Sequence, residues 1–112
     1  MDESKLTSGM AERLAHAGGG ERLDAIVELQ PLTPLASGTR EARIAWLRTR
    51  FDEEARRVQA AIQATGGEVL GAAWINQTLR TRLPAESFAA LVELPEVFRI
   101  DVPHALLMEA DS

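Results

Sequence analysis

The 112-residue chain contains no cysteine, and only 4% of its residues are aromatic. The absence of cysteine excludes disulfide bonds, thiolate metal ligands and cysteine nucleophiles. The chain also lacks a basic excess, because 12 Lys and Arg stand against 17 Asp and Glu, for a formal net charge of −5. A general phosphate-binding surface needs the opposite balance, and an RNA-binding sheet needs aromatic side chains for base stacking. We therefore expect no nucleic-acid partner.

Long apolar runs are missing as well. No stretch approaches the roughly 20 apolar residues that a membrane-spanning helix requires, so we expect no membrane association. The first ten residues, M-D-E-S-K-L-T-S-G-M, are acidic and polar, unlike a signal peptide. The sequence as it stands predicts a cytoplasmic protein, or a secreted or periplasmic one if a signal has been removed.

The remaining composition is that of one globular domain, with 46% hydrophobic and 26% charged residues. We expect three parts along the chain. Residues 1–20 are predicted to form an N-terminal helix and a glycine linker. Residues 21–103 are predicted to form the folded domain, and residues 104–112 an extended C-terminal tail.

Apolar residues at helical spacing predict the N-terminal helix from Glu3 to Ala17, and Gly18-Gly19-Gly20 would end it. We expect this helix either to pack loosely on the domain or to bind a partner. A second helix is predicted from Thr39, a suitable N-cap, to Thr65, with Gly66-Gly67 as the left-handed stop. Its core stripe comprises Ile44, Leu47, Phe51, Ala55, Val58 and Ile62.

Alternating apolar residues predict the strands. The first runs from Leu23 to Gln30, with Ile26 on its polar side. The runs Glu68 to Ile75 and Thr78 to Leu83 flank a turn or a kink at Asn76-Gln77, and two such runs in sequence predict an antiparallel pair. In the former, Val69, Ala73 and Ile75 are expected on one face, with Leu70, Ala72 and Trp74 on the other.

A short helix beginning at Pro84 and a last strand from Val97 to Val102 complete the series. In that last strand, Val97, Arg99 and Asp101 are expected on one face. The order β-α-β-β-α-β predicts an α+β, ferredoxin-like fold. Its four-stranded antiparallel sheet would carry two helices on one face, with the N-terminal helix in addition.

No group of residues suggests an active site. His16 and His104 are far apart in the sequence, and no acidic residues near His16 have the spacing of a metal-ligand set. No serine lies in a G-x-S-x-G turn, and the glycine clusters lack the Lys-Ser/Thr of a phosphate loop. The acidic run Asp52-Glu53-Glu54 is expected on a solvated helix face. We therefore expect no catalytic residues, no metal, no cofactor and no enzymatic activity.

The stretch W-I-N-Q-T-L-R-T-R-L-P-A-E-S-F-A-A-L-V-E-L-P-E-V-F-R-I-D resembles the inhibitor I9 family, the propeptides of subtilisin-like serine proteases and their free-standing relatives. That family has an alternating strand, a Pro-Ala-Glu helix start, a Leu-x-x-x-Pro-x-Val step and a short last strand. The positions that fit are Asn76, Leu79, Leu83, Pro84, Glu86, Leu91, Pro95, Val97, Ile100 and Asp101. The opening strand D-A-I-V-E-L is also similar, and the resemblance covers roughly residues 23–109.

The resemblance implies a domain that docks its sheet on a subtilisin-like protease, assists the folding of that protease and then inhibits it. The tail residues Leu106, Leu107, Met108 and Glu109 would occupy the substrate groove. Leu106 would lie nearest the large apolar subsite, and Met108 or Glu109 nearest the catalytic serine. On the sheet, the resemblance and the strand pattern together suggest a docking surface of Trp74, Thr78, Arg80, Arg82 and Asp101.

Independently of the resemblance, Pro103 favours an extended exit from the last strand, and an apolar A-L-L-M segment near a chain end is suited to strand addition on a partner. The alternative is a frayed helix or a tail that rests on its own sheet.

Two positions depart from the family pattern. Gln77 replaces a glycine after Asn76, and Pro103 replaces an acid. Because no protease domain follows Ser112, we expect either a free-standing inhibitor or an excised propeptide, monomeric alone and forming a 1:1 complex. The alternative is a ferredoxin-like interaction or dimerisation module without a protease partner.

Overall fold

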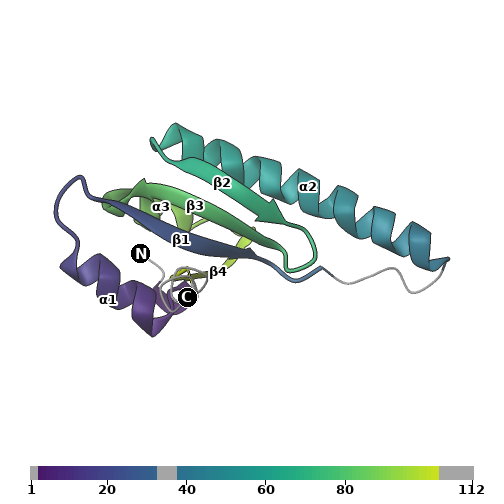
Figure 1. The fold of residues 1–112 in the computed structure, drawn as a ribbon, viewed down its shortest axis with the longest axis horizontal. Helices are drawn as coiled ribbons and strands as arrows, with labels where there is room; N and C mark the ends of the chain where they lie inside the picture. Colours follow the sequence, from purple (N-terminus) through teal and green to yellow (C-terminus); the bar gives the residue numbers. More distant parts are fainter. Residues whose placement is uncertain (1–2, 33–37, 104–112) are drawn as a thin grey trace, which may run out of the picture.

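The computed structural model describes residues 3–32 and 38–103 (Figure 1). Its main elements are β1 (Arg22–Leu29), α2 (Arg40–Ala64), β2 (Glu68–Ala73), β3 (Thr78–Pro84), α3 (Phe88–Leu91) and β4 (Val97–Asp101). The strands form one four-stranded sheet in the order β2-β3-β1-β4, and each neighbouring pair is antiparallel. This is the predicted ferredoxin-like topology, so the predicted fold class is confirmed.

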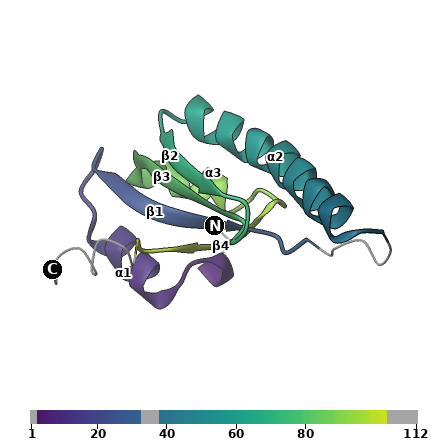
Figure 2. The same cartoon turned by 45° about the vertical axis from the view of Figure 1, so that its right-hand side comes forward.

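The core lies between the sheet and the helices α2 and α3, which cover the same side of it (Figures 1 and 2). The alternation in β1 explains the arrangement, because Leu23, Ala25, Val27 and Leu29 are all buried at every second position. From α2, a stripe at helical spacing meets them and comprises Phe51, Ala55, Val58 and Ile62.

Helix α2 begins and ends where the sequence predicted. The Thr39 hydroxyl accepts a hydrogen bond from the Ala42 amide at 3.1 Å, as an N-cap does. At the other end Gly66 has φ of +87°. The Gly67 amide donates to the Ile62 carbonyl at 2.9 Å, which completes a Schellman motif. The predicted core stripe is wrong at Ile44 and Leu47, which are only half-buried because the first turns of α2 extend past the sheet (Figure 1).

Two bulges overturn the predicted alternation in the edge strands. In β2 the register shifts between Val69 and Gly71, so Leu70 is the extra residue and is 40% exposed. Ala72 then pairs with buried Leu79, which places Ala72 rather than Ala73 on the side of Val69.

In β4 a shift opposite Glu28 and Leu29 leaves Phe98 42% exposed. Val97 and Ile100 are both fully buried, so the expectation that Val97 shares a face with Arg99 is wrong.

The short helix between β3 and β4 starts later than expected. Pro84 is the last residue of β3, and a 3-10 turn, η2 (Ala85–Ser87), precedes α3. Ser87 is buried, and its hydroxyl donates to the Thr65 carbonyl at 3.1 Å. This bond satisfies a carbonyl at the end of α2 and joins the two helices.

The N-terminal residues form two short elements rather than the predicted continuous helix. A 3-10 turn, η1 (Glu3–Lys5), is followed by α1 (Ser8–His16), whose N-cap is Thr7. Met10 is 0% exposed and belongs to the core, with Leu6, Leu14 and Ala17 packed against it. The expectation of loose packing is therefore wrong, because burial of Met10 makes α1 part of the same hydrophobic core.

Candidate protein-binding face of the sheet

The sheet has a second face, turned away from α2 and α3, which we call the outer face. Because strand side chains alternate, the residues between the buried ones point to this side. The outer face carries Asp24, Ile26, Glu28, Thr78, Arg80, Arg82, Arg99 and Asp101. It is partly to fully solvent-exposed at each of these positions.

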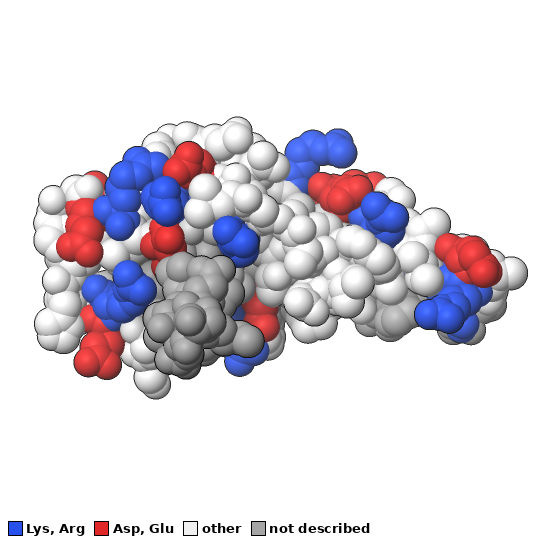
Figure 3. All heavy atoms as spheres, in the orientation of Figure 1, with Lys and Arg blue, Asp and Glu red and all other residues white. Residues whose placement is uncertain are grey.

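Strand register places opposite charges side by side on this face. Arg82 lies between Asp24 on β1 and Glu68 on β2 in the pairing. Its Nε is 2.6 Å from Asp24 Oδ1, and its Nη1 is 3.7 Å from Glu68 Oε1. Arg99 pairs across strands with Glu28, at 2.8 Å between Nε and Oε2. Figure 3 accordingly shows blue and red side chains next to one another on the surface.

In these ion pairs, the pKa shifts favour the charged forms of the partners. The hydrogen bond from Arg82 is the main cause that lowers the pKa of Asp24, against the opposing effect of burial. Hydrogen bonds to Asp24 and Glu28 raise the pKa of Arg82 and Arg99 respectively. Each pair is largely solvated, so its main effect is to keep both partners charged and aligned.

Arg80 has a different environment. Its cross-strand neighbours are Ile26 on β1 and Gly71 on β2, neither of which is acidic. Among the described residues, no ion pair to Arg80 is seen, and its side chain is exposed. Small residues of β2 leave a hollow of 430 Å³ beside it, lined by Ile26, Gly71, Ala72, Ala73, Asn76, Thr78 and Arg80. An apolar side chain with an acidic neighbour is the chemistry that fits this hollow.

Four of the five residues predicted for the docking surface share the outer face, namely Thr78, Arg80, Arg82 and Asp101. The placement of Trp74 on that face is wrong. Trp74 lies in the turn after β2, packs against the core, and has the Arg48 guanidinium of α2 at 5.4 Å from its ring centroid. The bulge at Leu70 and the end of β2 at Ala73 remove it from the strand pattern.

Two further residues matter that the strand pattern did not single out as part of a site. Ile26 is the centre of the outer face, paired with Arg80 on one side and Asp101 on the other. Thr7 donates a hydrogen bond from Oγ1 to Asp101 Oδ1 at 2.7 Å. Sequence spacing gives no signal for this contact, because the two residues are 94 positions apart. The predicted tail residues Leu106, Leu107, Met108 and Glu109 lie outside the described residues.

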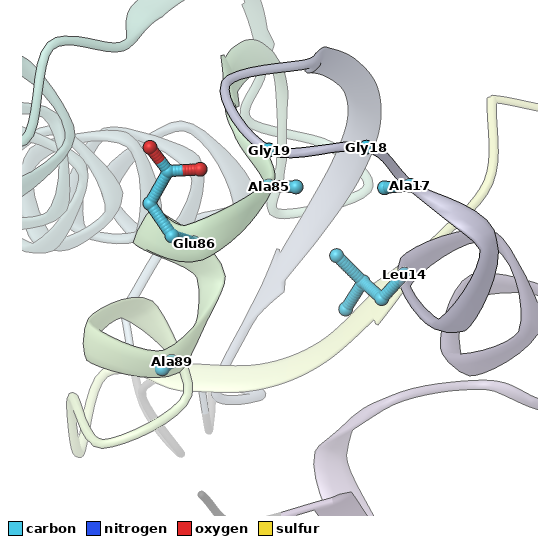
Figure 4. A pocket seen from close by; sticks show the side chains of 7 residues that line it. All are labelled: Leu14, Ala17, Gly18, Gly19, Ala85, Glu86 and Ala89. Carbon is cyan, nitrogen blue, oxygen red and sulfur yellow. The ribbon is translucent and has the colours of Figure 1, made fainter.

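A second hollow, of 290 Å³, lies between the end of α1 and η2 with α3 (Figure 4). Its lining is mostly small and apolar, with Glu86 the one ionisable side chain, so it offers no set of converging polar groups. Within residues 3–32 and 38–103, no three His, Asp or Glu side chains cluster in a way that would hold a metal ion. His16 is exposed and hydrogen-bonded to the Glu12 carbonyl, and His104 is outside the described residues.

No family model matches the chain, and neither the curated proteins nor the solved structures gave a significant match. In the part of the chain that the structure describes, no helix combines the length and the apolar character needed to cross a membrane.

Proposed function

We propose that this protein is a propeptide-like inhibitor, and a folding chaperone, of a subtilisin-like serine protease. The outer face docks on the protease, and the residues after Pro103 enter the substrate groove. The resemblance to the inhibitor I9 family suggests the class. The observation that carries the proposal is the outer face itself, where Ile26 and a hollow lie beside Arg80, which forms no ion pair with a described residue.

The energetics of docking follow from the charges on this face. Arg82 and Arg99 already have acidic partners, so a protease gains little by replacing those ion pairs. Arg80 has cross-strand neighbours that are not acidic and only a longer-range attraction to Asp24, so an acidic side chain on the protease can pair with it without breaking a close ion pair. An interface of standard size takes about 800 Å² from each partner.

The tail contributes in a second way. An extended segment adds to a partner as a strand, and its alternate side chains enter pockets. Inhibition by such a segment is substrate-like and depends on slow release rather than on chemistry by this chain.

Inhibition of a panel of subtilisin-like proteases tests the proposal. We expect deletion of Leu106 to Ser112 to abolish most inhibition, because the groove is then left open. We expect Arg80→Glu to weaken inhibition by roughly tenfold, since a well-placed interface charge contributes about 1–2 kcal/mol. The matched control is Arg56→Glu, the same charge change at an exposed position on α2.

Equal potency of the deletion variant and the intact chain would exclude the tail mechanism. Equal effects of the two arginine variants would mean that general charge, rather than the outer face, guides binding. An intact chain that inhibits none of the proteases would exclude the class.

A second candidate is an interaction or dimerisation module without a protease partner. One observation favours it: among the described strands, β2 has a neighbour on one side only, and its residues near this edge include Leu70, which is 40% exposed. Ile75, in the following turn, is 77% exposed. An open strand edge with apolar side chains favours pairing with another chain. Size-exclusion chromatography with light scattering distinguishes the two, because a stable dimer supports this candidate and a monomer opposes it.

A further inference from the structure

The N-terminal segment is attached to the open side of β4. Leu6 forms a parallel bridge with Ile100, and the Thr7 amide donates to the Ile100 carbonyl at 3.1 Å. Lys5 Nζ donates to the Leu94 carbonyl at 2.9 Å, which adds a third contact. The segment Lys5 to Gly9, here called the strap, therefore lies beside the last strand just before the chain leaves the sheet.

Thr7 is the centre of the strap. Its Oγ1 accepts a hydrogen bond from the Met10 amide at 3.3 Å, as the N-cap of α1, and donates to Asp101 Oδ1 at 2.7 Å. The same Asp101 oxygen accepts from the Val102 amide at 2.7 Å. One carboxylate oxygen thus connects Thr7 to the backbone immediately after β4.

Val102 is also held by its side chain. A methyl group added to Gly9 would lie 3.8 Å from both γ-carbons of Val102, so the start of α1 is adjacent to that side chain. Val102 is half-buried and packs against the core. Pro103 lies two residues after the end of β4, and its ring restricts its own φ. The path of the chain away from β4 is therefore fixed by contacts from the opposite end of the sequence.

We propose that Thr7 is a positioning residue that holds the backbone at Val102, from which the C-terminal residues continue, an inference that rests on the proposed function. A segment held along one path before binding loses less conformational freedom on binding, so it binds more tightly than the same segment on a free hinge. The strap would supply this pre-organisation in an inhibitor whose tail enters a protease groove. The N-terminal helix thereby gains a role beyond filling the core.

The experiment compares three variants of the whole chain. Thr7→Val keeps the shape and removes the hydroxyl, and Thr7→Ser restores it. Thr39→Val is the matched control, because Thr39 caps α2 in the same manner, with its hydroxyl 3.1 Å from the Ala42 amide. Hydrogen exchange at the Val102 amide is measured first, and the inhibition constant for a subtilisin-like protease second.

We expect Thr7→Val to accelerate exchange at Val102 and to raise the inhibition constant, each by about tenfold, as loss of a hydrogen bond to a charged group predicts. Thr7→Ser is expected to behave like the wild type. Thr39→Val is expected to lower global stability while leaving both readings within about twofold.

Equal exchange at Val102 in Thr7→Val and Thr39→Val overturns the inference whatever the protease results. Faster exchange with an unchanged inhibition constant also overturns it, because the path would then not matter for binding. If the wild-type chain inhibits no such protease, the proposed function fails, and the exchange comparison still decides whether Thr7 holds the chain after β4.

Discussion

Replacing Gly67 with alanine tests how closely β2 is packed on the core. Gly67 joins α2 to β2 at a point where a β-carbon would lie 2.6 Å from Leu83 Cβ and 2.8 Å from Ile62 Cγ2. Carbon atoms prefer separations of about 3.5–4.0 Å, so the backbone or both neighbours must move by about 1 Å. Neither neighbour has room, because Ile62 and Leu83 are both 0% exposed.

The expected cost follows from that geometry. Over-packing of a core costs about 1–3 kcal/mol, and we expect about 3 kcal/mol here because side chains from two different elements are displaced. The melting temperature would fall by roughly 10 °C for a domain of this size. Urea unfolding followed by the fluorescence of Trp46 and Trp74 measures the free energy.

The matched control is Gly71→Ala in the same region of the chain. No atom lies within 4 Å of the added methyl group, and the backbone there does not have a positive φ. We expect Gly71→Ala to raise the free energy of unfolding by about 0.5–1 kcal/mol, since alanine loses less freedom on folding than glycine. A Gly67→Ala variant within about 0.5 kcal/mol of the wild type would refute the close approach of Gly67 to Ile62 and Leu83.

Two further predictions concern single side chains. Hydrogen bonding to Arg82 lowers the pKa of Asp24 below its ordinary value of 3.8, so this pair stabilises the fold at neutral pH and the contribution is lost as pH falls through the lowered pKa. Asp24→Asn should therefore flatten the acid side of a plot of unfolding free energy against pH, and an unchanged slope would contradict the pairing. Gln77 has φ of +56°, so Gln77→Gly should be about 1 kcal/mol more stable than Gln77→Ala in urea unfolding; equal stability would contradict the left-handed turn.

The same position shows the cost of a residue other than glycine in this turn. Glycine adopts a positive φ at little cost, whereas the positive φ of Gln77 is strained by its side chain. In return, Gln77 Oε1 accepts a hydrogen bond from the Leu32 amide at 3.2 Å and ties the hairpin turn to the chain after β1. The turn was predictable from Asn76-Gln77, but this bond between residues 45 positions apart was not.

Local patterns in the sequence determined most of the architecture. The alternation in β1, the Thr39 cap and the Gly66 stop each depend on residues within a few positions, and the structure confirms them. The order of the elements then left few possible topologies, because a helical connection between two parallel strands of one sheet is almost always right-handed. For these reasons the sheet order required no information beyond the chain itself.

Tertiary structure decided what the faces carry. A bulge is an extra residue relative to a partner strand, so the apolar alternation within β2 or β4 gives no sign of those at Leu70 and Phe98. Both side chains are exposed as a result. Burial of Met10 and the bond from Thr7 to Asp101 join the two ends of the chain. Such contacts depend on which segments the completed sheet brings together. The scaffold and most of the outer face were therefore readable from the sequence, whereas the bulged edge strands and the anchoring of β4 were settled only by packing between distant residues.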